Sequence, residues 1–106
     1  GGTNDVSTAE KMRIDSSGRL LVGTSAKRNV GAIEAQFQVE GLSGDTAGIS
    51  ITRNSADQNP PYLILAKSRG TVDGAVTAVQ ADDDIGRIRF AAADGTDTSS
   101  LCSGSK

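Results

Sequence analysis

The chain has 106 residues, a formal net charge of −2 and 36% hydrophobic residues, 13 of which are alanine. Leu, Ile, Val and Phe together make up 22 residues, close to the level of about one-fifth at which a chain has little apolar surface for a core. No run of about 18 apolar residues is present, which excludes a membrane-spanning helix. Dispersed charges, 11 basic and 13 acidic, argue against nucleic-acid binding, because counterion release needs clustered Lys and Arg.

The first predicted element is a β-hairpin in residues 10–24, EKMRIDSSGRLLVGT. Alternation places Met12 and Ile14 on one face of the first strand, and a Ser-Ser-Gly turn follows. Two strands of this size do not stabilise themselves, so the hairpin must pack against something else. We predict an N-terminal hairpin module over residues 1–24 and a linker over residues 25–32; the stretch 24–32 interrupts the alternation, as a linker or a crossover would.

A β-sheet module is predicted over residues 33–97. Its clearest strand is 33–39, in which Ile33, Phe37 and Val39 share a face with Ala35. Three further strands are expected from alternation or from their apolar content: 47–53, 75–80 and 86–92. The segment YLILAK is apolar on both faces, which is typical of a central strand covered on both sides.

Turn-forming residues separate these segments at intervals of about ten to fifteen residues, as in an all-β meander, sandwich or barrel. No stretch keeps a helical stripe. The fold class predicted is therefore all-β, built of short antiparallel strands and hairpins. Residues 98–106 are rich in Ser and Gly and are predicted to form a flexible polar tail.

The sequence offers little for catalysis. Histidine is absent, which removes Ser-His-Asp and Cys-His catalysis and most zinc sites. Cys102 has no base to activate it. The run 82–84, three aspartates, is interpreted as a solvated turn rather than a calcium site, because consecutive side chains on an extended chain point in alternating directions. The loop 70–74 lacks the ending of a phosphate-binding loop.

The acidic residues Glu34, Glu40 and Asp57 are the remaining candidates for a glycosidase pair. None lies in a stretch that predicts burial, so a solvated surface role is favoured. We predict no catalytic residue, no cofactor and no metal site.

Several strings resemble parts of tail-fibre and tail-spike proteins of tailed bacteriophages, including phages of cyanobacteria. They are EKMRIDSSGRLLVGTS, AGISITRNSAD, YLILAKSRGTV and GAVTAVQADDDIGRIRFAAADGTD, and they span about Glu10 to Asp97. The resemblance implies an intertwined homotrimeric β-structured fibre module in the virion tail, outside the host cell. It carries no catalytic or binding residues over to this chain.

A trimer agrees with the composition, because three copies of a thin apolar face can form one core around an axis. The candidates for this core are Met12, Ile14, Leu20, Val22, Ile33, Phe37 and Val39. Exposed loops are where a fibre would contact a host glycan or protein. The candidates for receptor contact are Asn59, Pro60, Pro61, Tyr62, Arg69 and Asp73.

The expected partners are two further copies of the chain, other phage tail proteins, and a host surface glycan or protein, with neither nucleic acid nor membrane insertion. Two alternatives stay open at this point. The chain is a different structural β-module of the virion, in the baseplate or on the capsid, or it is a fragment of a tailspike that depolymerises glycans.

Overall fold

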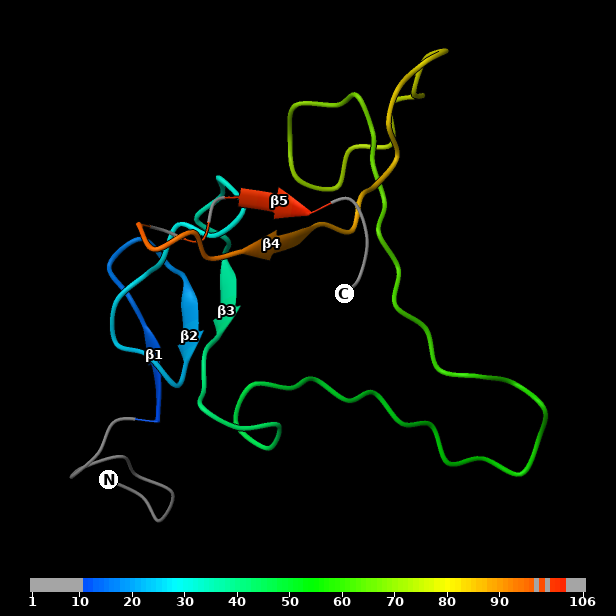
Figure 1. Cartoon of the computed structure of the whole chain (residues 1–106). Coiled ribbons are helices and arrows are strands. Elements are labelled where there is room, and N and C mark those ends of the chain that lie inside the picture. Colours follow the sequence, from blue (N-terminus) through cyan, green and yellow to red (C-terminus); the bar gives the residue numbers. More distant parts are fainter. Residues whose placement is uncertain (1–10, 97, 99, 103–106) are drawn as a thin grey trace. The chain divides into compact units, whose positions relative to one another are not determined.

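The structure, a computed structural model, consists of short β-strands joined by long irregular segments (Figure 1). It describes residues 11–96, 98 and 100–102; the other parts of the predicted hairpin module, sheet module and polar tail lie outside the described residues. No helix occurs in the described part, in agreement with the predicted non-helical fold. The strands are β1 (Met12–Ile14), β2 (Leu20–Val22), β3 (Phe37–Val39), β4 (Phe90–Ala92) and β5 (Ser100–Cys102).

Contacts divide the chain into two units. The first, which we call the sheet unit, comprises residues 1–50 and 89–106 and contains β1 to β5. The second, the central unit, comprises residues 51–88 and is inserted into the first in sequence. The module boundaries drawn from the sequence at residues 24, 32 and 97 stay predictions.

β1 and β2 pair antiparallel and form the predicted hairpin. The carboxylate of Asp15 closes its turn by accepting the backbone N–H groups of Ser17 and Arg19, both at 2.9 Å. The N–H of Gly18 donates to the Asp15 carbonyl at 2.9 Å, and Gly18 has φ of 86°, which glycine adopts without steric strain. The DSSG turn thus fixes the strand register through its aspartate and its glycine.

β3 pairs with β2 in parallel orientation, giving the sheet order β1-β2-β3. The predicted antiparallel pairing is wrong for this pair of strands. Parallel neighbours need a crossover of about a dozen residues or more, and the fourteen residues 23–36 between β2 and β3 provide it. The predicted linker therefore belongs to a crossover.

β3 is shorter than the predicted strand 33–39 because a tight turn precedes it. Val30 and Ile33 exchange both backbone hydrogen bonds, at 3.0 and 3.1 Å, around two residues with positive φ, Gly31 and Ala32. Ile33 is thereby drawn into the turn instead of extending β3. Alternation runs through residues 33–39, but residues 33–36 belong to no strand.

The C-terminal part of the sheet unit returns to this turn. The N–H of Gly31 donates to the carbonyl of Thr98 at 2.9 Å, and the Arg89 guanidinium donates to the carbonyl of Gly31 at 3.0 Å. β4 and β5 pair antiparallel beside it. β4 covers only the end of the predicted strand 86–92, and β5 lies within the predicted polar tail, where pairing with β4 orders it.

The central unit contains no strand in any of its residues, all of which the structure describes. The predicted strands 62–67 and 75–80 and the central-unit parts of 47–53 and 86–92 are therefore absent. Within the described part of the chain, no backbone-to-backbone hydrogen bond involves residues 51–67, so the predicted strand 62–67 has no partner there. Farther along, Arg69 donates its N–H to the Thr77 carbonyl at 3.1 Å, and this bond closes a loop.

Candidate functional site

One face of the three-stranded sheet is apolar from edge to edge. Residues directly opposite each other in neighbouring strands share a face, and every second residue along a strand does so too. The register pairs Met12 with Val22 and Ile14 with Leu20, and it pairs Leu20 with Phe37 and Val22 with Val39. The resulting apolar face consists of six side chains: Met12, Ile14, Leu20, Val22, Phe37 and Val39.

The opposite face presents Arg13, Leu21 and Gln38, which the register also places side by side. The crossover covers this face and is tied to it by side chains. The Arg13 guanidinium donates to the carbonyl of Ser25 at 3.2 Å. The Gln38 amide oxygen accepts the N–H of Arg28 at 2.9 Å, and its nitrogen donates to a second crossover carbonyl, also at 2.9 Å.

This cover buries Leu21 completely, at 0% exposure, and Leu21 is the one buried hydrophobic side chain in the described part of the chain. The apolar face is more open, and residues from the loop 41–50 after β3 line a hollow with Val22, Phe37 and Val39. Ile14 is 72% exposed, and Met12 and Phe37 are also largely exposed. The other three side chains of the face, Leu20, Val22 and Val39, are half-buried.

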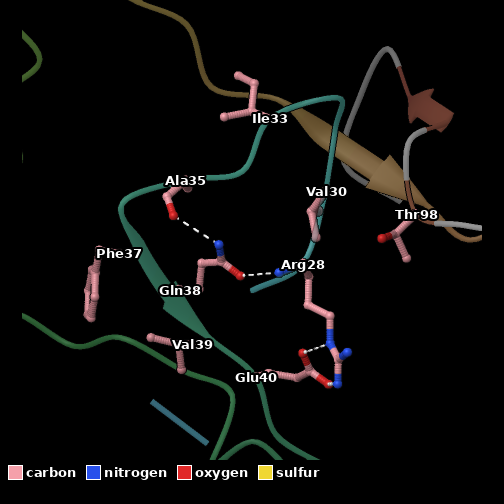
Figure 2. A pocket seen from close by; sticks show the side chains of 9 residues that line it. All are labelled: Arg28, Val30, Ile33, Ala35, Phe37, Gln38, Val39, Glu40 and Thr98. Carbon is pink, nitrogen blue, oxygen red and sulfur yellow. Dashed lines mark hydrogen bonds and ion pairs between the residues drawn. The ribbon is translucent and has the colours of Figure 1, made fainter. Parts of the chain in front are cut away.

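Six of the seven predicted core residues therefore lie together on the apolar face, and the seventh, Ile33, does not extend it. Ile33 lines a hollow beside β3 together with Val30 and Thr98 (Figure 2). In the same view Phe37 and Val39 lie on one side of β3 and Gln38 on the other.

The rim of this hollow carries an ion pair between Arg28 and Glu40 (Figure 2). Two guanidinium nitrogens of Arg28 meet the two carboxylate oxygens of Glu40, at 2.9 and 3.4 Å. This hydrogen bonding, with the charge of Glu40, raises the pKa of Arg28. The pair fixes the crossover to the end of β3 at the rim of a hollow whose lining is mostly apolar.

The predicted receptor-contact residues all belong to the central unit and all are exposed. The loop before Tyr62 is organised by its own side chains: Asp57 accepts from the Ser55 hydroxyl at 2.8 Å and from the Asn59 N–H at 3.0 Å. The Arg53 guanidinium adds a hydrogen bond to Ser55 at 3.1 Å. These contacts lower the pKa of Asp57, with the backbone hydrogen bond from Asn59 as the largest cause.

The remaining part of that loop, Pro60 and Pro61, precedes the exposed side chain of Tyr62. The second predicted loop holds Arg69 and Asp73. No hydrogen bond or ion pair among the described residues joins the two loops, so the structure does not gather the receptor-contact candidates into one site.

Arg69 forms a bidentate ion pair with Asp83, with N–O distances of 2.8 and 2.7 Å. The N–H of Gln80 donates to the same carboxylate at 2.8 Å. These donors, with Arg69 first, lower the pKa of Asp83 to about 2. The middle aspartate of the run 82–84 is thus committed to a structural ion pair.

The other acidic candidates are also paired. Glu34 lies 3.3 Å from a guanidinium nitrogen of Arg19 and 3.0 Å from the ammonium of Lys27. Among the described residues, no group of three or more His, Cys, Asp or Glu side chains is arranged to hold a metal ion. No helix capable of crossing a membrane is found there either.

Leu21 is the important residue that sequence reasoning did not single out. The signal was present in the run Leu20-Leu21-Val22, since the middle of three apolar strand residues points to the other face. Predicting that Leu21 is buried would also have required knowing which face of the sheet the crossover, residues 23–36, covers.

Comparison with known proteins adds no relative. No family model, no curated protein sequence and no solved structure matches this chain.

Proposed function

We propose that this chain is a non-enzymatic structural segment of a phage tail fibre, in which three copies pack their apolar sheet faces together and support attachment to the host. The observation that carries the proposal is the combination of one fully buried leucine with a sheet face of six apolar side chains, three of which are at least half exposed. Soluble proteins seldom leave a contiguous apolar surface open unless a partner covers it.

The assignment to a phage fibre, and the number three, come from the resemblance of the hairpin and later strings to fibre modules. Physical reasoning supports self-association independently. Full burial of one leucine contributes about 2 kcal/mol, which is comparable to the conformational entropy cost of ordering one or two residues. A chain of this kind gains stability when copies of it bury their apolar faces against one another.

Sedimentation of the purified chain tests the proposal. A trimer has three times the 10.8 kDa mass of one chain. Ile14→Asp places a carboxylate on the apolar face, where burial without a partner is costly, and should raise the trimer dissociation constant roughly 100-fold. Val76→Asp is the matched control, because Val76 is exposed and lies outside the sheet. A wild-type chain that sediments as a stable folded monomer would refute the proposal.

The position in the virion has its own test. Gold-labelled antibodies against this segment should bind along the tail fibres of a phage that carries it. Label on the baseplate or capsid would favour the alternative of a different virion module. Degradation of capsule or lipopolysaccharide by the purified chain would favour the depolymerase alternative; we expect none.

Host contact is assigned to the two exposed loops of the central unit, residues 54–61 and 69–74, with Tyr62 as the stacking surface for a sugar. The Asp57 network supports this role for the first loop, because a preorganised loop loses less entropy on binding. Tyr62→Ala should reduce phage adsorption about tenfold. Unchanged adsorption after replacing both loops would remove receptor contact from the proposal.

A further inference from the structure

The YLILAK segment, residues 62–67, combines apolar side chains with an unpaired backbone. Leu63 and Ile64 are 73% and 75% exposed. No backbone-to-backbone hydrogen bond joins this segment to any other described residue. Figure 1 shows it within the open green trace of the central unit.

Its side chains suit a strand covered on both faces. Ile64 would face one way, and Leu63 and Leu65 the other, while Tyr62 lies at the start of the segment, next to the exposed loop 54–61. In the central unit Leu65 already contacts the backbone at Gly86, where an added Cβ would lie 3.1 Å from the Leu65 Cβ. Because the described residues form no backbone hydrogen bond to the segment, its N–H and C=O groups are available to pair with another strand.

The sheet unit offers a matching edge at β3. Leu20 donates its N–H to the Gln36 carbonyl at 2.8 Å, and Glu40 donates to the Val22 carbonyl at 2.9 Å. Alternate residues of a parallel strand bond to the same neighbour, so the backbone groups of Phe37 and Val39 point away from β2. Within the described part of the chain, neither residue has a backbone partner on that outer side.

We propose that the YLILAK segment of one chain adds as a strand to the β3 edge of a second copy of this chain. The mode of recognition is β-strand addition, in which main-chain hydrogen bonds bind and alternate side chains enter the neighbour's core. The inference rests on the proposed homotrimer and specifies how its chains are interlocked.

Two observations identify a second copy as the occupant. The same sequence carries both the unpaired segment and the open edge, so the backbone groups of each chain can form hydrogen bonds with those of an identical chain. The added strand would lie next to Phe37 and Val39, which makes it continuous with the apolar face used for trimer packing. Charge does not oppose this contact, because residues 51–88 hold four basic and five acidic side chains.

Hydrogen exchange followed by mass spectrometry tests the strand addition in the full chain. In the wild-type trimer the amides of residues 62–67 should exchange roughly 100-fold more slowly than in the dissociated Ile14→Asp variant. A trimer in which these amides exchange at the rate of free peptide overturns the strand addition and leaves the trimer standing. Equal protection in the dissociated variant also overturns it, since the segment then pairs within its own chain. Absence of a trimer overturns both proposals.

A proline substitution provides a second readout. Ile64→Pro removes one ladder N–H and should raise the trimer dissociation constant at least about tenfold. Thr71→Pro, in an exposed loop of the same unit, is the matched control and should leave it unchanged. Equal dissociation constants for the two variants would overturn the strand addition.

Discussion

The sheet unit and the central unit have similar apolar content but organise it differently. In the sheet unit, short strands pair with one another and sort their side chains into a covered and an uncovered face. In the central unit, the most apolar stretch of the chain, YLILAK, pairs with no strand among the described residues. The difference shows that apolar alternation specifies which side chains share a face of a strand. Whether the strand forms depends on a turn or crossover that brings a second strand close enough for backbone hydrogen bonds.

Turn chemistry explains much of this difference. The DSSG turn caps itself through Asp15 and reverses the chain so that β1 meets β2. The loop of the central unit is also capped by an aspartate, Asp57, but Pro60 and Pro61 follow it. Two successive prolines lack the N–H groups with which a returning strand would begin its ladder. The first turn makes a hairpin and the second does not.

The largest expected effect on stability comes from truncating Leu21, the buried side chain that the crossover covers. Leu21→Ala should lower the free energy of unfolding by about 3 kcal/mol, through lost burial and the cavity left under the crossover. Leu42→Ala is the matched control, because Leu42 is fully exposed and should change stability by less than about 0.5 kcal/mol. Urea denaturation at fixed protein concentration measures both. Equal losses would contradict the burial of Leu21.

A smaller loss is expected at Gly23, which directly follows β2 and lies beside Glu40, the residue that follows β3. Gly23 has φ of 86°, and an added Cβ would lie 2.0 Å from the Glu40 carbonyl oxygen, which is backbone and cannot move aside cheaply. Gly23→Ala should destabilise the sheet unit by about 2 kcal/mol. Gly44→Ala, with open space around it, is the control. When Gly23→Ala is combined with the dissociating substitution Ile14→Asp, the amide hydrogen-exchange rates of residues 51–88 should stay unchanged. The destabilisation is confined to the sheet unit.

Sequence reasoning located the hairpin and the members of the apolar face because both depend on local patterns. The register of β1 and β2 follows from a short self-capped turn, and period-two alternation then determines which residues share a face. Met12, Ile14 and Phe37 are on that face for this reason.

The parallel pairing of β3 and the burial of Leu21 could not be read in the same way. Both depend on where a fourteen-residue crossover comes to lie, and that is set by contacts distant in sequence. The predicted strand 62–67 failed for a related reason. Its apolar composition is typical of a strand that is covered on both faces, and a single chain does not cover this segment in that way.

The smallest expected effect is an acid response that distinguishes the two units. A carboxylate whose pKa is lowered by folding contributes stability that is complete above its unfolded value, about 4, and lost as the pH falls through the folded value. The backbone N–H of Arg19 is the largest cause that lowers the pKa of Asp15 in the hairpin turn. The Arg69 ion pair lowers that of Asp83 to about 2, so its contribution disappears between about pH 4 and 2.

Carboxyl chemical shifts followed by NMR during an acid titration measure these groups separately. The Asp83 midpoint should lie near 2, and Arg69→Ala should move it toward the ordinary value of about 4. The same substitution should leave the Asp15 midpoint in place, because the donors to Asp15 lie in its own turn. The effect on stability is small because ion pairs near the surface are screened by water and salt. An Asp83 midpoint that does not respond to Arg69→Ala would show that this ion pair does not hold the loop of the central unit closed.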